Sequence, residues 1–186
     1  QSQRTRGAHI SLRTRGAHIS QRTRELPGVA VFGSEVPGAL RDLPKVSLDE
    51  LTGKRRILVT GAAAELAAVL TTLLRADRLD VEIAHVTSRR SARRALTAEA
   101  LRVPLIRDET GAVIAAAAEW RGTDGAALHG EAVVDDTVLF DGEVPGVRIE
   151  PTLFMPGLRA SVLSTRGRPR GWVTGRAAQL GTTGAH

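Results

Sequence analysis

The clearest pattern of apolar and polar positions along the chain lies in residues 55–86. The apolar run 57–59 ends at Thr60-Gly61 and predicts a short buried strand. Leucine and valine then recur three and four positions apart over 66–74, which is the spacing of one face of a helix. A second apolar stretch covers 81–86. Strand, helix and strand in this order predict a βαβ unit with parallel strands and a right-handed crossover.

After residue 102 the pattern changes to short apolar stretches separated by turn residues, such as Asp124-Gly125, Asp141-Gly142 and Pro156-Gly157. We therefore predict an α/β N-terminal half with the βαβ unit, followed by an antiparallel all-β meander in the form of a sandwich or half-barrel. The strands expected in this second half are 103–106, 112–120, 127–134, 137–140, 146–149, 158–163 and 172–180.

Four segments follow from these patterns. Residues 1–24 are an Arg-rich tail, expected to be disordered, in which the sequence from Arg4 to Ser11 returns nine positions later. Residues 25–54 are predicted to be an irregular linker with a short helix that begins at Ser47, which has capping-box spacing to Glu50. An α/β, Rossmann-like segment over 55–102 includes a second helix over 92–101, with Ser91 as its cap. A β-rich segment covers 103–186. We expect this segment to be truncated and its final strand to lack a partner.

Composition and charge limit the classes of function that the sequence supports. The chain has 186 residues, 42% of them hydrophobic, which is enough for a core. Residues 1–24 carry six arginines and no acid, residues 25–150 carry 15 basic and 20 acidic residues, and residues 151–186 carry five arginines and no acid. A generally basic, nucleic-acid-binding fold is therefore not indicated, although both ends remain candidate contacts.

Two further observations exclude classes of function. The absence of cysteine excludes disulfides, thiolate metal sites and a thiol nucleophile. Since no apolar run approaches about 18 residues, we expect no transmembrane helix and a cytoplasmic protein.

The sharpest candidate site is the turn after the first strand of the βαβ unit. In dinucleotide-binding folds, backbone amides at this turn and the helix that follows hold a phosphate. The residues in this position are Gly61, Ala62 and Ala64, and the second strand ends at Arg89 and Arg90. Arginine without an acid at that strand end favours the 2′-phosphate of NADP over NAD. The alternative is a purely structural βα turn.

The stretch from Arg56 to Gly61 resembles the opening of extended short-chain dehydrogenases and nucleotide-sugar epimerases. The glycine pattern of those enzymes falls on Gly61, Ala64 and Ala67, of which only the first is glycine. Their Tyr-x-x-x-Lys catalytic pair cannot be present, because the chain has no tyrosine.

A second candidate is the basic tract near the C-terminus, where arginines alternate with small residues. On an extended segment these side chains lie on one side, and with the neighbouring tryptophan they could bind a polyanion. The alternative is a solvated hairpin loop. The residues of this candidate are Arg166, Arg168, Arg170 and Trp172.

Other polar clusters have simpler interpretations. Asp135, Asp136 and Asp141 could ligate Mg²⁺ or Ca²⁺, but aspartate is also a usual turn residue, and we favour turns. His129 and Glu131 lie on one face of a strand as an ordinary polar pair or an acid–base pair. No metal site is predicted.

Two longer stretches, 58–83 and 128–181, resemble a group of actinobacterial proteins associated with the diacylglycerol and lipid kinase superfamily. That resemblance implies an α/β domain followed by a β-sandwich, in agreement with the two halves predicted above. It also implies nucleotide phosphates bound by a Gly-Gly-Asp-Gly loop. Gly-Gly never occurs in this chain, so no catalytic residue is carried over and the chain would be a degenerate or partial member.

The leading hypothesis is a soluble protein that binds a phosphorylated ligand or nucleotide at the Gly61 turn, with NADP or ATP as the candidate cofactors and no catalysis of its own. One alternative is an NADP-dependent oxidoreductase. Another is a protein that binds RNA, DNA or an anionic surface through the tail and the C-terminal arginines. The fourth hypothesis is that a protein partner pairs with an unpaired edge strand of this chain.

Overall fold

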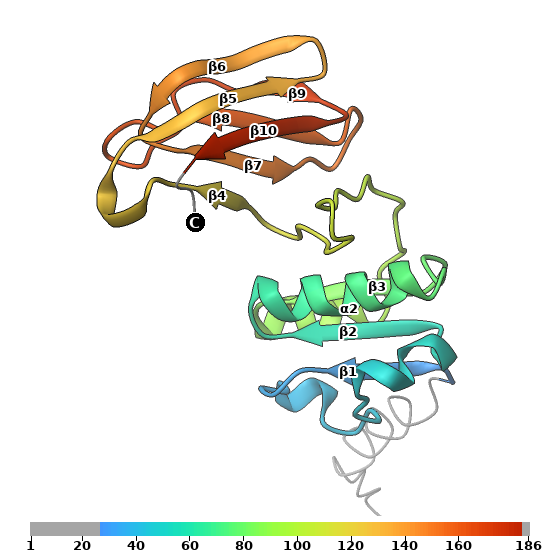
Figure 1. Cartoon of the computed structure of the whole chain (residues 1–186). Coiled ribbons are helices and arrows are strands. Elements are labelled where there is room, and N and C mark those ends of the chain that lie inside the picture. Colours follow the sequence, from blue (N-terminus) through green and yellow to red (C-terminus); the bar gives the residue numbers. More distant parts are fainter. Residues whose placement is uncertain (1–26, 184–186) are drawn as a thin grey trace, which may run out of the picture.

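Three parallel strands form the sheet of the N-terminal half in the computed structural model, which describes residues 27–183 (Figure 1). They are β1 (Val29–Phe32), β2 (Arg56–Thr60) and β3 (Glu82–Val86), hydrogen-bonded in that order. All five residues of β2 are buried, because β2 lies between the other two strands and both of its faces are covered. Their carboxyl ends meet at one edge of the sheet, where the loops that could bind a ligand begin.

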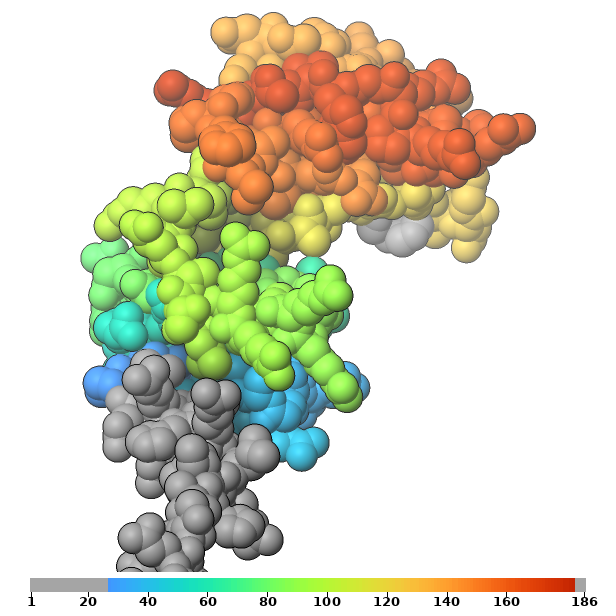
Figure 2. Space-filling model, turned by 180° about the vertical axis from the view of Figure 1, so that it is seen from behind, coloured from blue at the N-terminus to red at the C-terminus, as the bar shows by residue number. Residues whose placement is uncertain are grey.

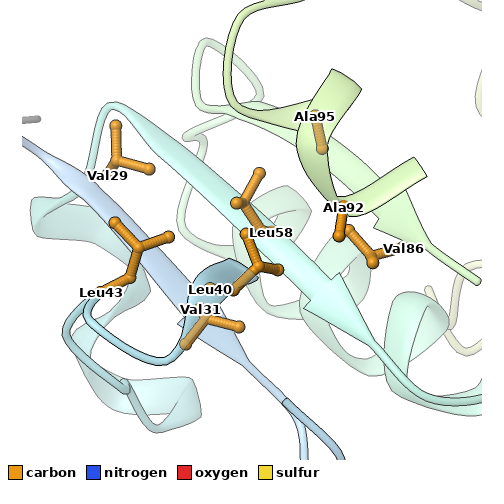
Figure 3. Close-up of a cluster of buried hydrophobic side chains, with 8 residues drawn as sticks. All are labelled: Val29, Val31, Leu40, Leu43, Leu58, Val86, Ala92 and Ala95. Atoms are coloured by element: carbon orange, nitrogen blue, oxygen red, sulfur yellow. The ribbon is translucent and has the colours of Figure 1, made fainter. Parts of the chain in front are cut away.

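Helices cover both faces of this sheet. On one face, α2 (Ala63–Arg75) and the 3₁₀-helix η2 (Leu48–Gly53) pack against Ala30, Ile57 and Val59. On the other face, α3 (Arg89–Ala95) and the short 3₁₀-helix η1 (Gly38–Leu40) complete a second cluster. Figure 3 shows the side chains of this second cluster, which are Val29, Val31, Leu40, Leu43, Leu58, Val86, Ala92 and Ala95.

The C-terminal half consists of two antiparallel sheets packed face to face. One has the order β10-β5-β6 and the other the order β4-β7-β8-β9. Leu128 and Phe140 of the first sheet pack with Val147 and Leu158 of the second, so the half is a sandwich. The strands are β4 (Ala118–Trp120), β5 (Leu128–Val134), β6 (Thr137–Val144), β7 (Val147–Pro151), β8 (Leu158–Val162), β9 (Val173–Gly175) and β10 (Ala178–Thr183), with the 3₁₀-turn η3 (Thr123–Gly125) between β4 and β5.

The predicted fold class is confirmed: a parallel α/β half precedes an antiparallel β half. The two halves lie at opposite ends of the molecule and are joined by residues 96–117 (Figures 1 and 2). The predicted tail, 1–24, lies outside the described residues. No helix within residues 27–183 is long and apolar enough to cross a membrane.

The prediction that residues 25–54 are an irregular linker is wrong for β1. Its four residues are a short apolar run, and pairing with β2 in parallel buries three of them almost completely. The short helix at Ser47 is confirmed as η2, with the capping box to Glu50 in place.

The second helix is shorter than predicted and begins earlier. Ser88 is its cap, because the Ser88 hydroxyl accepts the Ser91 N–H, while the Ser91 hydroxyl accepts the N–H of Ser88 in return. Ser91 is therefore the third residue of the helix and not its cap. The helix ends at Ala95, and the buried Arg56 side chain donates to the carbonyl groups of Ala95 and Ala98.

The strands predicted over 103–106 and 112–120 are mostly absent. Only one bridge, between Arg107 and Val113, joins the two segments, and β4 covers three residues. The Val113 N–H donates instead to the Thr71 hydroxyl of α2, at 2.9 Å, so this segment is held by the helix.

The last predicted strand is two strands, β9 and β10, separated by a turn at Arg176 and Ala177. The expectation that the final strand lacks a partner is wrong, because β10 pairs with β5 over six residues.

Candidate functional site

A pocket of about 530 Å³ lies between η1 and α3, the elements that follow β1 and β3 along the chain. We call it the arginine pocket, because four of its seven lining residues are arginines. Its lining consists of Pro37, Gly38, Ala39, Arg41, Arg89, Arg90 and Arg93.

Local structure explains why these arginines gather. Arg89 and Arg90 are the first residues of α3, directly after the Ser88 cap. Arg93 follows Arg89 by four positions, so it lies on the same side of the helix. Arg41 ends η1 and reaches the pocket from the opposite wall. The buried Ala92 and Ala95 anchor α3 on the sheet and leave the arginines at the surface.

The arginine pocket is strongly electropositive. All four arginines are exposed, and no acidic residue lines the pocket. Within residues 27–183, none of the four forms a salt bridge with a carboxylate. Guanidinium groups present planar pairs of N–H donors that match the oxygen atoms of phosphate and carboxylate groups. The pocket can therefore bind an anion of high charge.

The sequence identified only two of these four residues as site residues. Arg93 could have been identified from the sequence, since its spacing from Arg89 and Arg90 fits one helical turn. Arg41 could not, because it is brought to the pocket by η1, which follows the unpredicted strand β1.

The Gly61 turn has different surroundings. Gly61 adopts a φ of 109°, and its carbonyl oxygen lies 3.0 Å from the Nε2 atom of His85 at the end of β3. The Glu65 side chain packs against this glycine: an ideal Cβ atom at Gly61 would lie 3.1 Å from the Glu65 Cδ atom. The Oε2 atom of Glu65 is buried without a hydrogen-bond partner within residues 27–183.

The predicted site residues thus fall into two groups. Arg89 and Arg90 line the arginine pocket, whereas Gly61, Ala62 and Ala64 do not. An ionised carboxylate at Glu65 would repel a phosphate at the turn, since like charges a few ångströms apart are unfavourable. That the turn itself binds phosphate stays a prediction.

The predicted polyanion-binding residues lie at one end of the sandwich, in the loop between β8 and β9. Arg166, Arg168 and Arg170 are exposed, and Trp172 is 37% exposed. The guanidinium carbon of Arg159 lies 4.2 Å from the centre of the Trp172 ring, which is a cation–π contact.

Among the other polar candidates, Asp135 has a structural role. The Asp135 carboxylate accepts the N–H groups of Arg176 and Ala177 and so fixes the turn between β9 and β10. His129 and Glu131 are exposed on one face of β5. No group of three or more acidic or histidine side chains within residues 27–183 has the arrangement needed to hold a metal ion.

Ion pairs cross the four-stranded sheet. Arg148 donates to Glu119 at 2.6 Å and to Glu150 at 2.5 Å, and Arg159 donates to Glu150 at 2.5 Å. Arg121 completes the series by donating to Glu119 at 2.8 Å. We call these five residues the ion-pair ladder.

The ladder lowers the pKa values of both glutamates. Hydrogen bonds from Arg121 and Arg148 lower the pKa of Glu119 below its ordinary value. Burial alone would raise the pKa of Glu150, but hydrogen bonds from Arg159 and Arg148 outweigh burial and lower it. The ladder therefore holds two ionised carboxylates in the folded state at neutral pH.

A second cavity, of about 680 Å³, lies beside α2 and the segment 100–116. Its lining is mainly aliphatic, with Leu66, Leu70 and Ile106 among the contributing residues. Leu101 at its rim is 81% exposed. Since α2 and α3 cover opposite faces of the parallel sheet, this aliphatic groove and the arginine pocket are separate.

No protein-family model and no curated protein matches the chain. Among solved structures, the chain is similar to an NAD kinase from Archaeoglobus fulgidus, solved in complex with ATP, with a TM-score of 0.49 and 11% sequence identity. The similarity covers 82% of this chain and 75% of that chain. The relationship to lipid kinases in particular stays a prediction.

Proposed function

We propose that the chain binds a phosphorylated ligand of high negative charge in the arginine pocket. The observation that carries this proposal is the set of four exposed arginines that line one pocket without an acid. Concentrating four positive charges costs free energy in the unliganded protein, and a bound polyanion removes that repulsion. A nucleotide is the first candidate, and ATP and NADP are the forms to test.

The charge of the pocket favours a di- or triphosphate group over a single phosphate. One phosphate can pair with one or two of the guanidinium forks, whereas a pyrophosphate spans more of them. The amides of Gly61, Ala62 and Ala64 would add to this site only if the ligand extends along the sheet edge to the Gly61 turn. An ionised Glu65 carboxylate would oppose such an extension by its charge.

The test compares ligands and variants by thermal unfolding of the full chain and by calorimetric titration. The probes are pyrophosphate, orthophosphate, ATP with Mg²⁺, NAD and NADP. We expect pyrophosphate and at least one nucleotide to raise Tm by several degrees at about 100 times Kd, and orthophosphate to raise it less. The variant R89A/R90A should lose the shift.

Arg75 and Arg94 supply a matched control. Both are exposed, neither lines the pocket, and neither forms a salt bridge within residues 27–183. The variant R75A/R94A removes the same charge and should keep the shift. Equal loss in both variants would mean that the pocket has no role beyond net charge.

The catalytic alternatives have their own assays. We expect no hydrolysis of ATP and no transfer of its terminal phosphate. Oxidation of NADPH by the chain, with a dependence on Arg89 and Arg90, would favour the oxidoreductase alternative.

A further inference from the structure

The loop between β8 and β9 lies at the opposite end of the molecule from the arginine pocket, and the proposed function does not use it (Figure 1). We call residues 163–172 the arginine loop. We propose that the arginine loop and Trp172 form a binding surface for single-stranded nucleic acid. The proposal is independent of the ligand in the arginine pocket.

The loop is ordered by its own backbone hydrogen bonds. Ser164 accepts the Gly167 N–H and donates to the Arg168 carbonyl, both at 2.8 Å. The hydroxyl group of Ser161, which is fully buried, accepts the N–H groups of Arg170 and Gly171. A bridge between Leu163 and Pro169 closes the loop at its base. The loop is therefore preorganised, and ligand binding does not bear the cost of ordering it.

The extended part of the loop points its cationic and aromatic groups to one side. Residues 168–172 continue from the bridge at Pro169 towards β9, and alternate side chains of an extended segment share a face. Arg168, Arg170 and Trp172 are the alternating residues. This arrangement places two guanidinium groups and one indole ring in series, which suits two phosphates and one base.

The charge of this surface is not neutralised locally. Within residues 27–183, no carboxylate pairs with Arg166, Arg168 or Arg170, and residues 151–186 contain no acid at all. An ideal Cβ atom at Gly167 would lie 3.1 Å from the Nη2 atom of Arg121, so the guanidinium of Arg121 lies against the loop, but it is paired with Glu119 and adds no unpaired charge.

Trp172 is positioned for stacking. Arg159 covers the ring at 4.2 Å and is itself held by two hydrogen bonds to Glu150, so the ring is fixed in orientation. With 37% of the residue exposed, a base can extend the stack that Arg159 begins. Nucleic acid is favoured over a membrane surface because Trp172 is the one large apolar side chain that the arginine loop exposes, whereas Leu163 is buried.

The experiment is fluorescence anisotropy of labelled 12-nucleotide oligo-dT and oligo-U with the full chain, at several salt concentrations. We expect R168A/R170A to weaken binding about tenfold and to reduce the slope of log K against log salt by about 1.4, since each phosphate contact on a single strand contributes about 0.7. The exposed positions make a folding defect unexpected, and circular dichroism checks it.

Variants at Trp172 distinguish the contribution of base stacking from that of charge. We expect W172L to weaken oligo-dT binding about tenfold, W172F to keep most of it, and neither to change binding of heparin, which has no bases. The variant R89A/R90A, which removes the same charge from the other end of the molecule, should keep its oligonucleotide affinity, while R168A/R170A should keep the pyrophosphate shift.

Three outcomes would overturn the proposal. One is an oligonucleotide affinity that R168A/R170A leaves unchanged, which would locate binding elsewhere, for example in residues 1–24. Another is an equal loss of heparin and oligonucleotide binding in W172L, because a stacking role then fails. The third is binding to vesicles of anionic lipid that depends on the arginine loop while oligonucleotides do not bind, which would assign the loop to a membrane surface.

Discussion

Arg56 is a buried charged side chain of the parallel sheet in the α/β half. It is 8% exposed, donates from Nε to Glu82 at 2.5 Å, and donates to the carbonyl groups of Ala95 and Ala98 at 2.9 Å. One side chain thus joins β2, β3 and the end of α3. The variant R56L removes all of these hydrogen bonds and leaves the buried carbonyl group of Ala95 unpaired, so we expect a loss of about 2–3 kcal/mol in the free energy of unfolding.

The neighbouring residue is the control for this prediction. Arg55 pairs with the same Glu82, at 3.3 Å, but its side chain is 56% exposed. An exposed ion pair contributes little, so R55L should change the free energy of unfolding by less than about 0.5 kcal/mol. Urea denaturation measures both variants, and equal effects would show that burial does not distinguish the two arginines.

At the level of single residues, the capping box at Ser47 was predicted correctly, whereas the cap at Ser91 and the tertiary contacts were not. The capping box from Ser47 to Glu50 follows from short-range chemistry that a sequence displays. The buried position of Arg56 does not, since it requires α3 to end above the start of β2. For the same reason the sequence pointed to Arg89 and Arg90 but not to Arg41, which the fold brings to the same pocket.

At the level of elements, the ion-pair ladder joins β4, β7 and β8 and makes the sandwich sensitive to acid. The pKa values of Glu119 and Glu150 are lowered in the folded state, so their contribution is fully present above the ordinary glutamate pKa. It is lost as the pH falls through the lowered folded-state values. We expect E150Q to lower the free energy of unfolding by about 1–2 kcal/mol at pH 7 and to have a much smaller effect near pH 3.

Glu143 on β6 is the matched control for E150Q, because it is exposed and forms no salt bridge within residues 27–183. E143Q should leave the pH dependence of stability as in the unmodified chain. Urea midpoints from pH 3 to pH 7 provide the comparison. A difference between E150Q and the unmodified chain that stays constant with pH would contradict the role of the ionised carboxylate.

Hydrophobic periodicity was sufficient to predict some of the elements of this fold and not others. The βαβ unit and the hairpin from β5 to β6 were predicted because each is made by neighbouring segments with regular spacing. Strand β1 was missed because its four apolar residues are too few for periodicity, and only the parallel pairing with β2 identifies them. Residues 112–117 were predicted as strand from their apolar character, yet they lie along the aliphatic groove beside α2 and have almost no strand pairing.

At the level of the whole molecule, the two halves have separate cores. The clusters around Leu58 and Ile57 belong to the α/β half, and the cluster around Leu128 belongs to the sandwich. The linking segment contacts the α/β half, for example through the hydrogen bond from Val113 to Thr71. Sequence patterns assigned both halves to their class but said nothing of this separation, because it depends on which apolar faces meet.

Separate cores predict that damage to one half stays local. Leu58 and Leu128 are both fully buried, so L58A and L128A should each cost about 2–5 kcal/mol in the half that contains the substitution. Hydrogen exchange of the full chain, followed by mass spectrometry, distinguishes the halves. We expect L58A to accelerate exchange in peptides that cover β2 and β3, and L128A to accelerate it in peptides that cover β5 and β8. Acceleration of both sets of peptides by either variant would mean that the chain unfolds as one cooperative unit, and a ligand in the arginine pocket would then also protect the sandwich.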